Sequence, residues 1–320
     1  MIRAIGRLES RDLLAPEQAA FFTRVARQDL VSVRLELRAL LTAGVLMILA
    51  GTGLLVKEHF DRIGPTGIAA AIFAASVLCL AWVARRSPPF SRGEVPSPGL
   101  AFDSILVLGV LLFGTFLAWV ETEFHTLGPG WRHHLLLLAT FTLAAAFRFD
   151  SRPVFSLALT SFAAWRGVDA RLTLRTVFGN PEEAIRWNSI VCGALFLLAG
   201  WLCTRARWKA HFEPVWSNLG LVLLLGGLLS GALGTLGWAW PAWEAALSVA
   251  GGVVIAAGWR ERRILWFSQG VVAVYVGALR ILFEAFHGAE AWEAWLVVAV
   301  TSLGLVALLV IAHRRFREDE

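Results

Sequence analysis

Residues 40–56 read LLTAGVLMILAGTGLLV, a run without a single charged side chain. At a rise of 1.5 Å per residue, about 20 apolar residues form a helix that crosses a hydrocarbon core of roughly 30 Å. Comparable runs recur to the end of the chain. The sequence therefore predicts an all-α fold, a polytopic transmembrane helical bundle of about ten spans, at 38–56, 66–84, 101–120, 132–147, 153–166, 187–204, 217–236, 241–259, 264–284 and 292–312.

The composition of the 320 residues agrees with a membrane protein. Hydrophobic residues make up 57% of the chain and charged residues 17%, and the mean hydropathy is +0.65. Soluble proteins carry nearer a quarter charged residues. The net charge of +5 does not predict a nucleic-acid partner, because the charges lie between the apolar runs, where they act as topology signals. The lipid bilayer is the expected environment.

The Lys and Arg residues predict the orientation of the spans. If the N-terminus is cytosolic, the cytosolic segments hold about three times as many of them as the outer segments do, in agreement with the positive-inside rule. We therefore expect both termini in the cytosol of a bacterium and a multi-pass protein of its inner (plasma) membrane. No cleavable signal peptide is expected. The predicted division is a helical segment at 1–37, a transmembrane domain at 38–313 and a charged cytosolic tail at 314–320.

The N-terminal segment predicts a short amphipathic helix. Pro16 suits a first helical turn, and apolar residues then follow at roughly helical spacing up to Leu37, interspersed with arginines. One face could lie on anionic headgroups. Equally, it could dock on cytosolic parts of this protein or on a protein partner, and the sequence leaves these alternatives open.

The fourth and fifth spans are unusually short. The ranges 132–147 and 153–166 could cross as two short spans or form a re-entrant hairpin, and the charge pattern is compatible with both. A hairpin would carry Arg148, Asp150 and Arg152 into the membrane at a cost of a few kcal/mol each. We favour two short spans.

Two charges stand near the end of the ninth span, in GALRILFEAFHG at 277–288. Arg280 and Glu284 are four residues apart, so they share a helix face. In one interpretation Arg280 extends to the outer headgroups and pairs with Glu284. In the other it is the deepest cation of an outward-opening polar pocket, suited to a carboxylate or phosphate. The topology places further candidates for this pocket on the same side: Glu244, Arg166, Glu121 and His133.

Neither a metal nor another cofactor is predicted. Cys79, Cys192 and Cys203 lie in apolar runs without metal-binding or disulfide spacing. Adjacent histidines such as His133 and His134 point about 100° apart on a helix, which argues against a shared metal. No HExxH, GxSxG or P-loop motif is present, so the sequence favours a protein that is not an enzyme. The glycines of the seventh span, Gly227 and Gly231 among them, predict close helix packing.

Three segments together resemble a known family. They are LLAPEQAAFF at 13–22, the apolar run at 40–56 and DRIGPTGIAAA at 61–71. Their order resembles that of uncharacterised bacterial membrane proteins classed as a domain of unknown function, and FRFDSRPVFSLALTSFAAWRGV at 147–168 is similar to the middle of that family. The resemblance covers roughly residues 8–170. It implies a short soluble helix before many spans, and it implies no mechanism.

These observations leave three hypotheses for function. The first is transport of a small polar or anionic solute through the outward-opening pocket. The second is a non-catalytic membrane subunit or scaffold that docks a membrane or cytosolic partner through its N-terminal helix. The third is an enzyme that acts on lipid-linked substrates at the outer leaflet, for which only the outer carboxylates and histidines offer acid and base groups.

Overall fold

Helices account for most of the described residues, and no strand occurs among them. This confirms the predicted all-α fold. Most of the predicted N-terminal helical segment, 1–37, lies outside the described residues. The structure is a computed structural model of the full chain, and it describes residues 17–18, 34–173, 181–234, 240–285 and 291–318.

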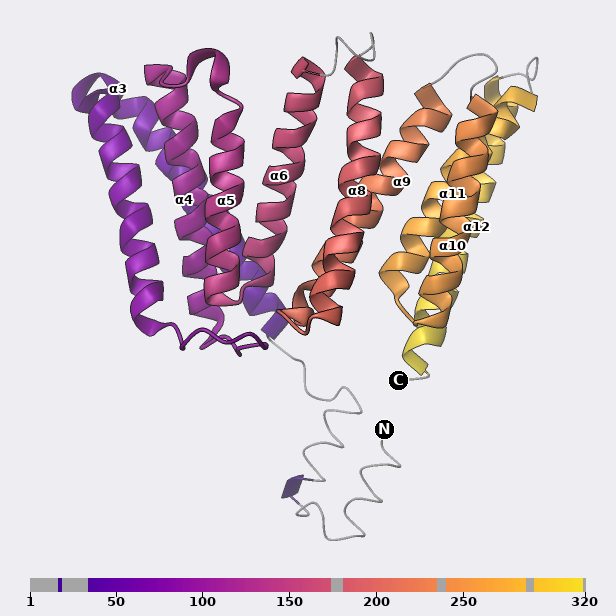
Figure 1. The fold of residues 1–320 in the computed structure, drawn as a ribbon, viewed down its shortest axis with the longest axis horizontal. Coiled ribbons are helices and arrows are strands. Elements are labelled where there is room, and N and C mark those ends of the chain that lie inside the picture. The colour runs from indigo at the N-terminus through magenta and orange to yellow at the C-terminus, as the bar shows by residue number, and fades with distance from the viewer. Residues whose placement is uncertain (1–16, 19–33, 174–180, 235–239, 286–290, 319–320) are drawn as a thin grey trace.

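The long helices stand side by side in a row and alternate in direction (Figure 1). The closest pairs are α3 with α4, α5 with α6, α8 with α9, and α10 with α11. Two short 3₁₀ helices, η1 (Gly128–Gly130) and η2 (Ala210–Phe212), lie in connections. The long helices are α3 (Arg34–Arg86), α4 (Leu100–Phe124), α5 (His133–Phe149), α6 (Arg152–Thr173), α8 (Pro181–Arg205), α9 (Glu213–Gly234), α10 (Trp240–Arg260), α11 (Ile264–Ala285) and α12 (Ala291–Glu318).

Seven stretches of the described helices are long and apolar enough to cross a membrane. The protein is thus a membrane protein with several apolar helices, and the expected count of ten is not established by this criterion. Helix α5 is apolar but shorter than these stretches, and α6 is not among the seven. Both nevertheless run the height of the row in Figure 1. The seven are Gly64–Arg86, Leu100–Phe124, Glu182–Arg205, Ala210–Gly234, Trp240–Arg260, Ile264–Glu284 and Trp295–Phe316.

The first two predicted spans lie on two helices that meet at a kink, and the label α3 covers both. The kink lies at Gly64, whose φ of 72° and ψ of 159° suit glycine, and Pro65 follows it. Proline fits the first turn of the second half, where its missing N–H leaves no bond unmade. Trp119 of α4 donates its indole N–H to the Pro65 carbonyl over 3.1 Å, which ties the kink to α4.

The connections gather at two ends of the row (Figure 1). We call the lower one the basic end; it holds residues 87–99, the α5–α6 turn, residues 206–212, residues 261–263 and the end of α12. The opposite end holds the Gly64 kink, η1, the start of α8 and the last residues of α9 and α11. Basic residues concentrate at the basic end: Arg85, Arg86, Arg92, Arg148, Arg152, Arg205, Arg207, Lys209, Arg260, Arg262, Arg263, Arg314, Arg315 and Arg317.

A buried ionic cluster at the basic end joins the first half of the row, α3 to α6, to the second half, α8 to α12. Asp150, in the α5–α6 turn, places Oδ1 at 3.1 Å from Lys209 Nζ and 2.5 Å from His211 Nε2, and these two residues belong to the α8–α9 connection. Its Oδ2 accepts a hydrogen bond from the backbone N–H of Val95. The Lys209 N–H bonds the Arg92 carbonyl over 2.9 Å. Three connections are therefore fixed to one another by groups that are shielded from water.

Glycines set the close approach of α9 to its neighbours. A Cβ on Gly193 of α8 would lie 2.6 Å from both the Gly220 carbonyl and the Leu224 nitrogen of α9. On α9, a Cβ on Gly227 would meet Ile190 of α8, and one on Gly231 would meet Trp243 of α10. The predicted packing role of Gly227 and Gly231 is confirmed. Because the helices are nearly in backbone contact here, larger residues could not be accommodated without moving a helix.

Candidate functional site

Arg280 reaches across to the end of a neighbouring helix. It lies on α11, and its Nη1 donates to the backbone carbonyls of Ala232 and Leu233, in the last turn of α9. The guanidinium also lies 5.3 Å from the ring centre of Trp240. The last carbonyls of a helix have no intrahelical partner and carry partial negative charge, so Arg280 supplies both hydrogen bonds and a compensating charge to α9.

Glu244 lies beside this helix end. It is 5% exposed, bonds Ser248 on its own helix α10 and interacts electrostatically with Arg280. A Cβ on Gly277 would lie only 2.5 Å from Glu244 Oε1, so glycine at this position of α11 makes room for the carboxylate. Glu244 Oε2 is buried and has no hydrogen-bond partner among the described residues. The structure thus brings two of the six predicted site residues together.

Of the other four predicted residues, only Glu284 lies on the same helix as Arg280. Arg166 of α6 stacks 5.6 Å from the Trp165 ring and bonds the Cys192 thiol of α8. Glu284 is exposed on α11, one turn beyond Arg280. Glu121 and His133 lie at the α4–α5 corner of the row. The six residues therefore form three separate groups.

At the α4–α5 corner the partner of Glu121 is His134. Glu121 Oε2 lies 2.8 Å from His134 Nε2 and also accepts the Leu127 N–H over 3.1 Å. His133 is exposed and contacts the Gly130 carbonyl instead. Glu121 and His134 also line a cavity of about 330 Å³ with Trp131. The contacts of Glu121 with His134 and with the Leu127 N–H hold in place the connection that contains η1. No group of three potential metal ligands occurs among the described residues.

Arg186 is a polar residue that sequence reasoning did not select. It is 7% exposed, lies on the first turns of α8 and stacks 5.4 Å from the Trp243 ring of α10. Its Nε donates to Ser230 Oγ of α9 over 3.3 Å, and its side chain lines a cavity of about 450 Å³. One sequence signal was available: Arg186 is seven residues before Gly193, so it lies on the face that packs most closely against α9.

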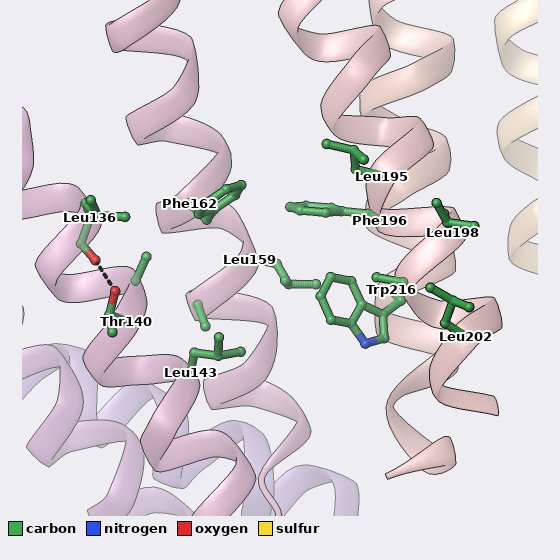
Figure 2. A pocket seen from close by; sticks show the side chains of 13 residues that line it. Leu136, Thr140, Leu143, Leu159, Phe162, Leu195, Phe196, Leu198, Leu202 and Trp216 are labelled. Carbon is green, nitrogen blue, oxygen red and sulfur yellow. Dashed lines mark hydrogen bonds between the residues drawn. The ribbon is translucent and has the colours of Figure 1, made fainter. Parts of the chain in front are cut away.

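A large apolar groove lies where the α5–α6 pair meets the α8–α9 pair (Figure 2). Its volume is about 490 Å³, and α5, α6, α8 and α9 contribute its walls. Its few polar atoms include the Thr140 hydroxyl, which donates to the Leu136 carbonyl. The α8 wall is about half exposed, so the groove opens sideways, toward the surface that the bilayer covers. We call it the seam groove; its principal lining residues are Leu143, Leu159, Phe162, Leu195, Leu198 and Trp216.

A basic residue continues the α8 wall of the seam groove. Leu195, Leu198, Leu202 and Arg205 follow at three- and four-residue steps, so they share one face of the helix. Arg205 is exposed at the basic end and stacks 5.7 Å from the Trp201 ring. It has no acidic partner among the described residues. The same surface is thus apolar at mid-height and cationic at its end.

The N-terminal part of the chain is similar to a family whose members have no assigned activity. Residues 6–155 match the family model described as "Predicted membrane protein (DUF2157)". This confirms the resemblance inferred from the sequence over that region, from before α3 to the start of α6. No curated protein and no solved structure matches the chain. The family description names no activity.

Proposed function

We propose that the protein spans the bacterial inner membrane ten times, with its basic end in the cytosol, and binds one anionic phospholipid in the seam groove. The acyl chain would lie between the two halves of the row, and the headgroup would face Arg205. Binding a lipid from the cytosolic leaflet is the function that the apolar groove and its charged end support best.

The proposed orientation rests on the distribution of basic residues. The connections at one end of the row carry most of the arginines of the described residues, and positive charge favours the cytosolic side. Helices α5 and α6 run the height of the row, so we count both as crossing, shielded by the longer helices α4 and α8. With the first half of α3 this gives ten spans and a cytosolic C-terminus.

Charge, rather than apolar contact, would select the lipid. Lipid tails are as apolar as leucine, so filling the seam groove with a chain gains little over leaving that chain in the bilayer. A basic residue near the surface attracts anionic lipid by about 1 kcal/mol. Because Arg205 stands on the same helix face as Leu198 and Leu202, a lipid whose chain follows that face brings its phosphate to the guanidinium. The preference is therefore for an anionic over a zwitterionic headgroup.

The observation that carries this proposal is the continuous face of α8 from Leu195 to Arg205. Native mass spectrometry of the full-length protein, with equal amounts of phosphatidylglycerol and phosphatidylcholine, tests it. We expect one tightly held phosphatidylglycerol per chain. Ala199→Phe, which fills the groove, should abolish this binding, whereas Ala194→Phe, on the exposed surface of the same helix, should not. Equal retention by the two variants would overturn the proposal.

Transport of a small anionic solute is the second candidate function. It is favoured by Arg186, the nearly buried arginine that lines the cavity at the opposite end. A carrier must first bind its solute on one side of the membrane, and this cavity would face the outside in the proposed orientation. The seam groove and this cavity are lined by different residues, so substitutions can test the two functions separately.

A further inference from the structure

The cavity at the opposite end lies between the first turns of α8 and the last turns of α9. Its walls combine an arginine, hydroxyl groups and glycines, and its volume is about 450 Å³. That volume falls within the range of roughly 300–1,000 Å³ usual for small-molecule sites. The residues on which its chemistry depends are Arg186, Ser189, Ser230 and Glu182.

Arg186 offers unused hydrogen-bond donors to this cavity. A guanidinium has five N–H groups, and the contact with Ser230 Oγ uses the one on Nε. The terminal nitrogens have no acceptor among the described residues. The side chain is 7% exposed, so it is held in place by protein and is largely removed from water. Such a guanidinium presents a planar fork that matches the two oxygens of a carboxylate or phosphate.

A purely structural role at the end of α9 does not account for Arg186. The carbonyls of Ala232 and Leu233, in the last turn of α9, already accept hydrogen bonds from Arg280. Arg186 approaches the same turn from α8, where its terminal nitrogen would lie 3.2 Å from a Cβ on Gly234. Because residue 234 is a glycine, no side chain at that position displaces the Arg186 guanidinium or separates it from the cavity.

We infer that this cavity binds one oxyanion, a carboxylate or a phosphate ester, through a bidentate contact with Arg186. Glu182 lines the same cavity, so a ligand that also carries an ammonium group a few ångströms away is favoured over one with a second anionic group. Phosphoethanolamine has this arrangement, either as a soluble compound or as a lipid headgroup. The site is separate from the seam groove and does not depend on lipid binding there.

The test uses full-length protein in dodecyl maltoside micelles free of phospholipid, with phosphoethanolamine as the soluble probe in calorimetry. A Cβ on Gly226, which lines the cavity, meets no atom within 4 Å, so Gly226→Leu fills the cavity without a backbone clash. We expect saturable binding that falls by about tenfold or more in this variant and in Arg186→Lys, because lysine keeps the charge but lacks the fork. Gly252→Leu on α10, equally open, is the matched control and should bind like the unmodified chain.

A second arm distinguishes the source of the headgroup. Native mass spectrometry after reconstitution with phosphatidylethanolamine should show retained lipid that is lost in Gly226→Leu and kept in Ala199→Phe if a lipid is the natural ligand. If calorimetry alone shows binding that Gly226→Leu removes, the ligand is soluble. If neither probe binds, or if Gly226→Leu binds both as well as Gly252→Leu does, the inference is overturned. Because Gly226→Leu leaves Arg186 in place, the test stands even if Arg186→Lys fails to fold.

Discussion

Lys209 and Asp150 form an ion pair of 3.1 Å with side chains that are 1% and 4% exposed. One lies in the α8–α9 connection and the other in the α5–α6 turn, so the pair joins two connections at the basic end of the row. Two charges are kept out of water only if each meets a partner and the remaining polar atoms are hydrogen-bonded. The contact of Asp150 with the Val95 N–H helps to meet that condition.

Asp150→Asn should destabilise the protein strongly, because it leaves the Lys209 ammonium buried without its carboxylate. We expect a loss of about 3–5 kcal/mol in the free energy of unfolding, seen as a lower melting temperature in detergent. Arg152→Gln is the control, since it breaks the exposed pair with Glu94 and should cost at most about 1 kcal/mol. Similar melting temperatures for the two variants would show that the buried pair contributes no more than the exposed one.

Arg280→Gln should loosen the end of α9 without changing the topology. Glutamine has one amide group and no charge, so the carbonyls of Ala232 and Leu233 lose a charged donor. We expect a stability loss of about 1–3 kcal/mol and faster hydrogen exchange in the last turn of α9. Arg260→Gln, at the basic end of α10, should leave that exchange unchanged. Complete loss of membrane insertion in Arg280→Gln would contradict this capping role.

Gly193→Ala should push α8 and α9 apart. The added Cβ would stand 2.6 Å from backbone atoms of Gly220 and Leu224, which cannot move independently of their helix. Gly252→Ala faces open space and should stabilise α10 by about 0.5–1 kcal/mol, the usual gain of alanine over glycine in a helix. Thermal unfolding of both variants provides the comparison. If the melting temperature of Gly193→Ala equals or exceeds that of the unmodified chain, α8 and α9 do not approach each other as closely as described here.

Cysteine labelling tests the proposed orientation. In a chain without Cys79, Cys192 and Cys203, Thr126→Cys should react with a membrane-impermeant maleimide in spheroplasts. Ser91→Cys should react only after the membrane is permeabilised, because residues 87–99 lie at the basic end. Both positions are exposed, so accessibility within the protein does not limit either reaction. The reverse pattern would place the basic end outside the cell.

The sequence predicted the helices of this fold better than the contacts between them. Apolar runs and clustered arginines are local signals, so the ranges of the expected spans fall on helices and the expected inner connections gather at one end. The first two expected spans lie on either side of the kink in α3, at the position that Gly64 and Pro65 mark in the sequence.

The site residues were harder to choose because a span that is apolar on every side gives no sign of which face meets its neighbours. Arg186 counted only as a charge near the outer surface, yet the close approach of α8 to α9 buries it. His134, rather than its neighbour His133, meets Glu121 because the turn of the helix separates their directions. The partners of Asp150 come from a distant connection, which no spacing rule could link to it.

An experimental structure by electron cryomicroscopy, in nanodiscs that contain phosphatidylglycerol, tests the central claim most directly. We predict density for an acyl chain in the seam groove between Leu159 and Leu198, continuous with a headgroup beside Arg205. The same density should be absent from Ala199→Phe. An empty groove in the unmodified protein, or a chain whose headgroup lies away from Arg205, would contradict the account.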